Sequence, residues 1–440
     1  MKSFLIKQPL RPLQGKVVLP GDKSIAHRSL ILSAIATGKT TIYNLSLNDD
    51  NLSTLKVLKQ LGMDIGEVCK NRVTVSGRGL FGLRQPFKSI FINESGTTLR
   101  LLLGVLAGQN FKTIVTAGRS LSRRPMHRVT EPLRMMGARI IARHQVKGEE
   151  YPPLIISGGK LKGITYRMPL ASAQVKSAIL LAGLYAQGKT TIIEKIKTRD
   201  HTERMLKLFK AKIKTKGNNI ILEQADKLIS PGKIYIPGDI SSAAFFIVSA
   251  AILPKSKLFL KNVGLNPSRI GIVRVLMRMG ADIKVTSRQP SVISYEPMGD
   301  LIVRSSFLKG TVVNKKEIPT LIDELPVLMV AASLAQGKTI LKGTGELRVK
   351  ETDRIRSMCE NLRKMGAKIK IAKGAHSEDI IIEGVKQLRG AKVKSFGDHR
   401  TAMSMVVAGF VAQGQTLIDD VSCISKSFPD FLKILKILAG

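Results

Sequence analysis

The sequence predicts a mixed α/β (α+β) protein of two similar domains, each built from three repeated βαβαββ-type units and joined by a two-strand hinge. Three observations support this fold class: a helix-and-strand module that recurs six times, a second helix that ends at glycine, and two strand patterns interrupted by Pro-Gly. Periods of tens of residues are typical of repeat architectures. The length of 440 residues also favours more than one domain.

The first module begins at Gly21-Asp22-Lys23-Ser24. Asp22 and Ser24 are favourable N-cap residues, and the apolar run that follows them has helical spacing. We expect Gly38 to end this helix in a left-handed C-cap and the β-branched residues after it to form a strand. The same pattern begins again at five later positions, namely Asn93, Ala171, Gly238, Ile322 and Phe396.

A second helix follows most of these modules and ends in a similar signature. Its glycines are Gly62, Gly137, Gly280 and Gly366. Each follows a helical pattern and precedes an alternating strand pattern, as in Lys368-Ile369-Lys370-Ile371. The unit of helix, strand, helix and strand therefore repeats about every 70 to 80 residues, and six copies account for nearly the whole chain.

Two sequences, Pro20-Gly21 and Pro237-Gly238, interrupt strand patterns and enclose three complete units. We interpret them as crossings between the domains. The first domain is then expected to contain residues 1–20 and 239–440, and the second residues 21–238, with hinges near 20–22 and 237–239.

The composition is that of a globular protein, with 44% hydrophobic residues. The N-terminus lacks the long apolar segment of a signal peptide, and the apolar runs are too short to span a bilayer. Neither the three cysteines (Cys69, Cys359 and Cys423) nor the six histidines are spaced as metal ligands. We therefore expect a soluble, cytoplasmic protein without a metal site.

The formal net charge of +39 makes nucleic-acid binding an alternative function. However, the basic residues are spread through the chain, aromatic residues amount to 5%, and no helix-turn-helix, zinc-finger or RNP pattern is present. A solvated basic surface, with a basic cleft for small acidic substrates, accounts for the charge more simply.

One segment, Gly183–Thr190, matches the phosphate-loop pattern G-x-x-x-x-G-K-[ST]. That motif requires a strand before the loop and a helix after it, whereas the order predicted here is the reverse. We therefore expect no ATPase. No G-x-G-x-x-G follows a strand either, so no dinucleotide cofactor is predicted.

Several segments indicate capture of small anions. The first helix start carries three candidate ligands beside free backbone N–H groups, namely Lys23, Ser24 and Arg28. Arg123-Arg124 adds two guanidinium groups, which suit bidentate binding of phosphate or carboxylate. Lys350 and Arg354 are four residues apart, so we expect them on one helical face with Glu351 between them.

On these segments the chain resembles the 5-enolpyruvylshikimate-3-phosphate synthases, the 3-phosphoshikimate 1-carboxyvinyltransferases of the shikimate pathway. The matching stretches occur in order along the chain: Gly21–Ser24 with Arg28, Asn93–Arg100, Arg123–Met126, Ala171–Lys176, Asp323-Glu324, Arg348–Arg354, Gly397–Arg400 and Lys426–Asp430. The resemblance implies two similar domains of three repeated units each, an inside-out α/β barrel arrangement, which agrees with the repeats found above.

The resemblance implies transfer of the enolpyruvyl group of phosphoenolpyruvate to the 5-hydroxyl of shikimate 3-phosphate. The transfer proceeds by addition and elimination through a tetrahedral intermediate and releases phosphate. The implied catalytic residues are Asp323 as base, Glu351 as acid, and Lys23. The implied contacts of shikimate 3-phosphate are Lys23, Ser24, Arg28, Ser172, Ala173, Gln174, Arg199, Asp323 and Lys350. Those of phosphoenolpyruvate are Lys23, Gly96, Arg124, Gln174, Arg354, Arg400 and Lys426.

The implied partners are these two small-molecule substrates alone, without cofactor, metal, nucleic acid or membrane, on the route to chorismate and the aromatic amino acids. We expect a monomer. Because Gly96 leaves room beside phosphoenolpyruvate, we also expect glyphosate to inhibit the enzyme and Gly96→Ala to relieve that inhibition in part.

The chain departs from the family pattern at a few positions. Many members have Asn-Ala-Gly-Thr where this chain has Asn93–Thr97, Ala173 replaces a serine, and Glu346 stands where some members have asparagine. The nearest alternative is the sister transferase that acts on UDP-N-acetylglucosamine. That enzyme typically carries a reactive cysteine on the loop that corresponds to Ser122–Pro125, and no cysteine lies there.

Overall fold

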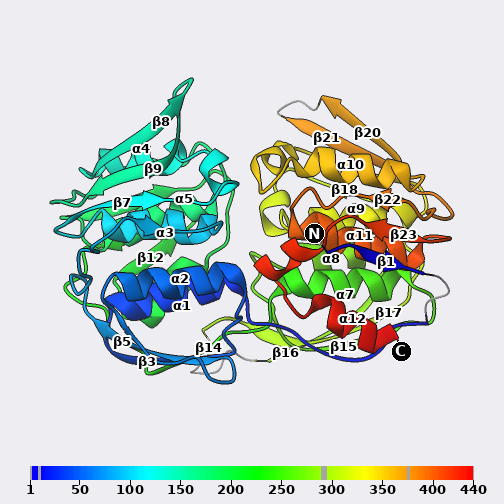
Figure 1. The fold of residues 1–440 in the computed structure, drawn as a ribbon, viewed down its shortest axis with the longest axis horizontal. Coiled ribbons are helices and arrows are strands. Elements are labelled where there is room, and N and C mark those ends of the chain that lie inside the picture. The colour runs from blue at the N-terminus through cyan, green and yellow to red at the C-terminus, as the bar shows by residue number, and fades with distance from the viewer. Residues whose placement is uncertain (1, 8–10, 289–294, 374–376, 440) are drawn as a thin grey trace. The chain divides into compact units, whose positions relative to one another are not determined.

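The computed structural model describes residues 2–7, 11–288, 295–373 and 377–439 (Figure 1). The chain divides into two compact units. Unit 1 contains the chain up to Pro20 and most of the chain after Pro237, and unit 2 contains Gly21–Pro237 together with, among the described residues, Tyr295 and Glu296. Each unit is described by itself below.

Three inner helices in each unit are buried on nearly all sides. They are α1 (Lys23–Ile35), α3 (Gly96–Leu106) and α5 (Ala173–Gly183) in unit 2, and α7 (Ile240–Ile252), α9 (Leu325–Leu334) and α11 (His399–Val411) in unit 1. In α7, every residue from Ile240 to Ala251 is buried. A helix that is buried all round belongs to the core, so these helices form the centre of each unit.

The outer helices bury only one face. They are α2 (Asp49–Gln60), α4 (His127–Met135) and α6 (His201–Leu208) in unit 2, and α8 (Gly271–Arg278), α10 (Arg354–Lys364) and α12 (Phe431–Ala439) in unit 1. The described residues also form four short 3-10 helices: η1 (Leu121–Arg123), η2 (Ile318–Thr320), η3 (Gly345–Val349) and η4 (Ser422–Lys426). Within the described ranges, none of the helices is both long and apolar enough to cross a membrane.

The described part of unit 2 contains three four-stranded sheets of one design. An edge strand pairs in parallel with the strand that follows an inner helix, and a hairpin adds two antiparallel strands. In sheet order the strands are β14 (Lys233–Tyr235), β3 (Thr37–Tyr43), β5 (Arg72–Arg78) and β4 (Asp64–Ile65); β6 (Ile90–Phe91), β7 (Lys112–Thr116), β9 (Glu149–Ser157) and β8 (Arg139–Val146); β10 (Thr165–Arg167), β11 (Lys189–Ile193), β13 (Asn219–Glu223) and β12 (Ile213–Lys216).

In its described residues, unit 1 has two sheets of this design and a third with three strands. In sheet order the strands are β2 (Gln14–Val18), β15 (Lys257–Gly264), β17 (Met298–Arg304) and β16 (Asp282–Arg288); β18 (Val312–Val313), β19 (Lys338–Leu341), β21 (Glu378–Glu383) and β20 (Lys368–Lys373); β22 (Lys392–Val393), β23 (Thr416–Ile418) and β1 (Phe4–Ile6). In the third sheet β1 pairs antiparallel with β23, where the other sheets have a hairpin. The mixed α/β fold of repeated units is confirmed, but the sixth copy is incomplete.

An edge strand precedes each Pro-Gly sequence and pairs within its own unit, while the chain after it continues into the other unit. β2 leads directly into α1 of unit 2 but pairs with β15 of unit 1, whereas β14 leads into α7 of unit 1 but pairs with β3 of unit 2. Backbone hydrogen bonds fix both strand ends, from Asp22 N–H to the Pro237 carbonyl (2.8 Å) and from Asp239 N–H to the Pro20 carbonyl (2.9 Å). Unit 2 is therefore inserted into unit 1 with its own sheets complete.

The glycines predicted to end the second helices do so. Gly62 (φ 78°) follows α2, its N–H donates to the Lys59 carbonyl (3.0 Å), and Met63 N–H donates to the Leu58 carbonyl (3.1 Å), as in a Schellman motif. Gly137, Gly280 and Gly366 also have positive φ.

The prediction that Gly38 is a helix C-cap is wrong. The cap of α1 is Ala36 in an extended conformation, and Gly38 (φ 96°) lies within β3, three residues beyond the end of the helix. The left-handed conformation of Gly38 turns the chain from the helix into the strand. Gly188 (φ 86°), directly before β11, has the same role. The order of α5 before and β11 after this glycine confirms that Gly183–Thr190 is no phosphate loop.

Candidate active site

In unit 2, the start of α1 holds Lys23 beside an acidic partner. Asp22 Oδ1 accepts a hydrogen bond from Ile25 N–H (3.0 Å), which caps the helix as predicted. Lys23 Nζ lies 2.8 Å from Asp50 Oδ2, at the start of α2. Sequence reasoning missed Asp50, although an acidic first turn after the Asn48 cap is typical of a helix start. Asp50 holds the ammonium group of Lys23 in place.

Arg28 connects three helices of unit 2. Its guanidinium donates to the Ser24 carbonyl (2.8 Å) of α1, to Ser177 Oγ (2.7 Å) of α5 and to Thr202 Oγ1 (2.7 Å) of α6. Burial lowers the pKa of Arg28 to about 10, and the charge of Arg199 acts in the same direction. Arg28 therefore remains a cation at neutral pH, and Arg199 lies near enough to affect it.

A second basic group surrounds the start of α3. Arg100 Nη1 donates to Gln174 Oε1 (2.6 Å), and Gln174 Nε2 donates to Thr97 Oγ1 (2.9 Å), so the predicted ligand Gln174 is oriented from α3. A Cβ atom added at Gly96 would lie 2.7 Å from Arg124 Nη1 and 3.0 Å from Arg100 Nη1. Arg100 lies in a matching stretch, but its role in orienting Gln174 was not predicted.

Glu94, noted above as a departure from the family pattern, anchors the loop before Arg124. Its Oε1 accepts a hydrogen bond from Ser120 N–H (3.1 Å) and its Oε2 one from Leu121 N–H (2.8 Å). These are the backbone groups at the start of η1, and Arg124 follows the end of η1. The Glu94 carboxylate therefore fixes the segment that carries Arg124.

A buried charged cluster lies beneath the remaining predicted ligands. Ser172 caps α5, and Ala173 is the first residue of that helix. Lys176, which is fully buried, lies 3.2 Å from Glu194 Oε2 and 2.6 Å from Glu203 Oε1. Glu194 Oε1 in turn accepts hydrogen bonds from the backbone and the hydroxyl of Thr198 (3.1 and 2.6 Å). The cluster thus fixes the backbone just before Arg199.

A network of buried hydroxyl groups joins α1, α2 and α3 behind Lys23. His27 Nδ1 lies 2.7 Å from Thr54 Oγ1, Thr54 Oγ1 lies 2.7 Å from Thr98 Oγ1, and Thr98 donates to Ser95 Oγ (2.7 Å). Among the described residues, His27 Nε2 has no hydrogen-bond partner. Burial, with the charges of Lys23 and Arg28, lowers the pKa of His27 well below 6.5.

His27 therefore makes stability depend on pH. Below pH 6.5 the unfolded chain protonates this histidine and the folded chain does not, so unfolding takes up a proton. The free energy of unfolding should then fall by up to about 1.4 kcal/mol per pH unit as the pH decreases. We expect His27→Gln to remove this contribution, as measured by urea unfolding of both proteins between about pH 7.5 and about pH 5.5. Equal pH dependence in the two proteins would contradict the assignment.

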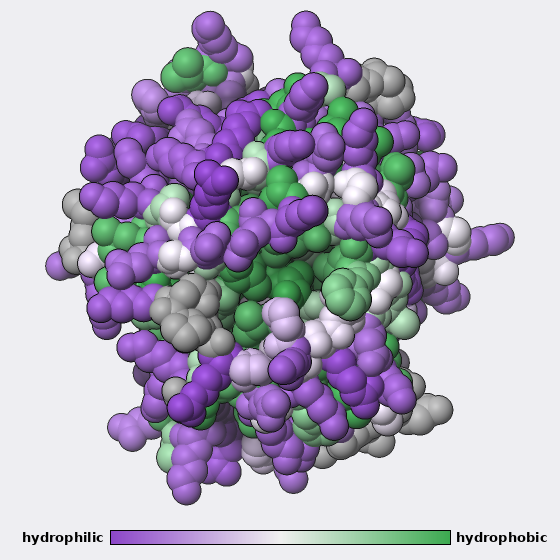
Figure 2. All heavy atoms as spheres, turned by 90° about the vertical axis from the view of Figure 1, so that its right-hand side faces the viewer, coloured by the Kyte–Doolittle hydropathy of each residue, from purple (hydrophilic) through white to green (hydrophobic). Residues whose placement is uncertain are grey.

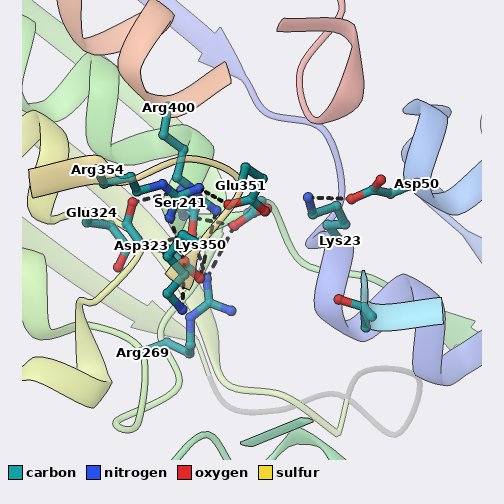
Figure 3. Close-up of polar contacts among 12 residues, drawn as sticks. Lys23, Asp50, Ser241, Arg269, Asp323, Glu324, Lys350, Glu351, Arg354 and Arg400 are labelled. Atoms are coloured by element: carbon teal, nitrogen blue, oxygen red, sulfur yellow. Dashed lines mark hydrogen bonds and ion pairs between the residues drawn. The ribbon is translucent and has the colours of Figure 1, made fainter. Parts of the chain in front are cut away.

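In unit 1, the Arg354 guanidinium contacts three carboxylates, two of which, Asp323 and Glu351, are labelled in Figure 3. Arg354 is 1% exposed, and its nitrogens lie 2.8 Å from Asp398 Oδ2, 3.3 Å from Asp323 Oδ1 and 2.5 Å from Glu351 Oε2. Burial lowers the pKa of Arg354, but the three carboxylates outweigh this effect and raise it above its ordinary value. The two predicted catalytic carboxylates are thus held on one cation.

The expected helical face from Lys350 to Arg354 is not observed. The 3-10 helix η3 ends at Val349, and α10 begins only at Arg354, with Asp353 as its cap. Glu351 and Arg354 meet across the bend between the two helices. Lys350 Nζ still lies 4.0 Å from Asp323 Oδ1.

The other predicted ligands of unit 1 lie on α11 and η4. Asp398 caps α11 and places Arg400 in its first turn, where Arg400 Nη1 donates to the Asp323 carbonyl (3.0 Å). Arg400 Nη2 lies 3.9 Å from Asp323 Oδ2. Lys426, the last residue of η4, donates to the Gly397 carbonyl (3.3 Å). Asp323 is therefore surrounded by Lys350, Arg354 and Arg400.

Sequence reasoning missed a second buried cluster beside Asp323. Arg269 Nη2 donates to Ser241 Oγ (2.8 Å) and lies 3.8 Å from Glu324 and 3.6 Å from Asp239. Ser241 also hydrogen-bonds Glu324, the N-cap residue of α9 (Figure 3). The cluster joins the starts of α7 and α9. The only sign of this cluster in the sequence is that an acidic residue, Glu324, directly follows the predicted base, Asp323.

The comparisons with known proteins place the chain among the transferases. The model of the family described as EPSP synthase (3-phosphoshikimate 1-carboxyvinyltransferase) matches residues 7–435. A 3-phosphoshikimate 1-carboxyvinyltransferase of Thermoanaerobacter sp. is 47% identical and that of Petrotoga mobilis 45%, each over 97% of this chain and 98% of the relative. A solved EPSP synthase from Acinetobacter baumannii is 41% identical, covers 100% of this chain and 98% of its own, and has a TM-score of 0.86.

The chain belongs to the EPSP synthase family. The family resemblance inferred from the sequence is confirmed, and this membership favours the shikimate-pathway transferase over both alternatives, the UDP-sugar transferase and the nucleic-acid-binding protein.

Proposed function

We propose that the chain transfers the enolpyruvyl group of phosphoenolpyruvate to the 5-hydroxyl of shikimate 3-phosphate, with Asp323 and Glu351 as its base and acid. The observation that carries this assignment is the pairing of both carboxylates with the Arg354 guanidinium, in a member of this family. An acid and a base held on one cation can serve proton transfers at two atoms that are bonded to the same carbon.

In the addition step, Asp323 takes the proton of the 5-hydroxyl while the oxygen forms a bond to C2 of phosphoenolpyruvate. Glu351 gives a proton to the methylene carbon, so that C2 becomes tetrahedral and C3 becomes a methyl group. In the elimination step, the bond from C2 to the phosphate oxygen breaks, a methyl proton returns to Glu351, and the leaving phosphate takes the proton that Asp323 accepted, which restores the base. The products are the enolpyruvyl ether and inorganic phosphate.

The unit 2 residues serve the anionic groups of shikimate 3-phosphate. Lys23, Ser24 and Arg28 at the start of α1, with Arg199, suit its phosphate, because a helix N-terminus and guanidinium groups favour doubly charged anions. In this proposal the start of α5 contributes three further contacts to the same substrate, namely Ser172, Ala173 and Gln174. Asp323 and Lys350 of unit 1 complete its set of contacts.

The phosphoenolpyruvate contacts come from both units. Unit 2 contributes Lys23, Gly96, Arg124 and Gln174 to this set. Unit 1 contributes Arg354, Arg400 and Lys426. The orientation of Gln174 by Arg100 supports its assignment to both substrates. Five of these side chains are cationic, which suits a substrate that carries a carboxylate and a phosphate.

The function is tested by measuring phosphate release with shikimate 3-phosphate and phosphoenolpyruvate together, and with each omitted in turn. We expect release only when both are present. Release that continues without either substrate would overturn the assignment. A cytoplasmic location and a monomeric state stay predictions, and light scattering of the purified chain tests the second.

Substitution of Gly96 tests the phosphoenolpyruvate site. The methyl group in Gly96→Ala would lie within 3.0 Å of the guanidinium groups of Arg124 and Arg100, so these must shift. We expect the inhibition constant of glyphosate to rise by about tenfold or more, which corresponds to about 1.4 kcal/mol, and KM for phosphoenolpyruvate to rise less. An unchanged inhibition constant would count against this placement of Gly96.

Glu94 is expected to act as a positioning residue for Arg124. In Glu94→Ala, two backbone N–H groups lose their acceptor, and we expect KM for phosphoenolpyruvate to rise by about tenfold while kcat and KM for shikimate 3-phosphate change little. Glu94→Gln keeps one strong acceptor oxygen and should recover part of the loss. If the wild type is active and Glu94→Ala has normal kinetics, this role is refuted.

A further inference from the structure

Unit 1 has a hollow where its three inner helices end. The hollow has a volume of about 980 Å³, and its floor is formed by the last residues of α7, α9 and α11 and by the loops 305–309 and 384–387. Apolar side chains of the floor include Ala251, Leu253, Leu308, Ala335, Phe410 and Ala412. In Figure 2, which faces this end of unit 1, apolar side chains gather in the centre and hydrophilic ones surround them. This volume is that of a site for a small molecule.

Unit 2 shows that the fold does not require such a hollow. Tyr185 follows α5 and is 7% exposed, its hydroxyl donates to the Leu80 carbonyl (3.0 Å), and its ring packs edge-on against Phe81 at 5.5 Å. A Cβ atom at Gly108 would lie 2.1 Å from this ring. The space at the helix ends of unit 2 is therefore filled by a side chain of its own.

The equivalent positions in unit 1 carry smaller residues. Tyr185 precedes Ala-Gln-Gly-Lys-Thr, and Leu334 precedes the same five residues at the end of α9. Val411 has the same place before Ala412 at the end of α11. Both line the hollow without filling it. Phe307, also at the hollow, is 99% exposed, which is unusual for so large an apolar side chain.

The charged residues that line the hollow indicate which kind of ligand it would bind. Of the described residues that line it, three are lysines (Lys255, Lys309 and Lys386) and none is acidic. The lysines are exposed. Helix C-termini carry partial negative charge, so the floor disfavours an anion while the lysines favour one. An acidic group would therefore lie near the lysines, and an apolar body would cover the floor.

We propose that this hollow of unit 1 binds an amphipathic organic anion, a molecule with an apolar chain or ring and a single carboxylate. A strongly polar anion such as a nucleotide would leave the apolar floor uncovered, and an apolar cation would meet three like charges. The proposal concerns a site apart from the proposed catalytic residues, which lie at the opposite ends of the same helices, the N-termini of α9 and α11.

The test is calorimetric titration of the full chain with decanoate, and with decyltrimethylammonium as a probe with the same chain and opposite charge. We expect saturable binding of one decanoate per chain and none of the cation. Leu334→Tyr, which copies the filled arrangement of unit 2, should abolish binding. Val411→Phe is a second filling variant if the first does not fold. Phosphate release by folded variants should stay unchanged.

A matched pair of lysine variants separates the site from the general charge of the protein. A variant in which all three lysines of the hollow, Lys255, Lys309 and Lys386, are replaced by Gln should bind decanoate at least about tenfold more weakly, which corresponds to about 1.4 kcal/mol. The same change at Lys212, Lys214 and Lys216, which are exposed on unit 2, removes equal charge and should have little effect. Absence of saturable binding, binding that survives the filling variants, or equal losses in the two lysine variants would overturn the proposal.

Discussion

Asp323→Asn is expected to lower kcat by about 10² to 10⁴-fold, because an amide of the same shape cannot accept the hydroxyl proton. KM for both substrates should change much less. Arg354 retains Asp398 and Glu351 as partners in this variant, so the arrangement of unit 1 should persist. The measurement is phosphate release at saturating concentrations of both substrates.

The matched control is Asp282→Asn. Asp282, the first residue of β16, pairs with Arg304, the last residue of β17, at 3.0 Å; the two side chains are 46% and 36% exposed, and an exposed pair contributes little to stability. We expect normal kinetics in this variant. If Asp323→Asn retains more than about a tenth of the wild-type kcat, the general-base assignment is refuted.

Arg354→Met is expected to lower the free energy of unfolding of unit 1 by about 3 to 5 kcal/mol, the usual effect of removing one partner from a buried ion pair. The methionine fills the volume, but Asp398, whose side chain is fully buried, loses the guanidinium 2.8 Å away. Activity should also be lost, since Asp323 and Glu351 lose their common partner. Urea unfolding and phosphate release measure the two effects.

A second substitution separates the two effects. In Arg354→Met with Asp398→Asn, the buried charge is gone, and the asparagine oxygen can still accept the hydrogen bonds that Asp398 Oδ1 receives from Arg400 and Thr401. Most of the stability should return, while the activity should not. A single variant as stable as the wild type, or a double variant no more stable than the single one, would contradict this account.

The fold was predictable largely because its signals are local and recur. N-cap residues such as Asp22, Asp239 and Asp398 and helix-ending glycines such as Gly62 act within a few residues of their own position. Gly38 was misassigned because a left-handed glycine signals a turn of any kind, and the sequence does not distinguish a helix end from the start of a strand. The pairing of β1 with β23 joins the two ends of the chain, so no local pattern could indicate it.

The candidate site was predictable to the extent that its residues lie in the family's motifs. The supporting partners lie elsewhere: Asp50 holds Lys23 from α2, Arg269 holds Glu324 from the loop before α8, and Glu94 holds a loop more than twenty residues away. These contacts depend on how the helices pack, which one sequence without relatives does not reveal. The bend between Lys350 and Arg354 was missed because four-residue spacing has meaning only inside a continuous helix.

The position of β2 has a consequence for synthesis on the ribosome. Unit 2 can fold as soon as Pro237 has emerged, since all strands of its sheets lie between Gly21 and that residue. β1 and β2 emerge before unit 2, but their partners β23 and β15 are made more than two hundred residues later. These nascent edges must stay unpaired throughout that interval, and unpaired strand edges are where newly made chains begin to aggregate.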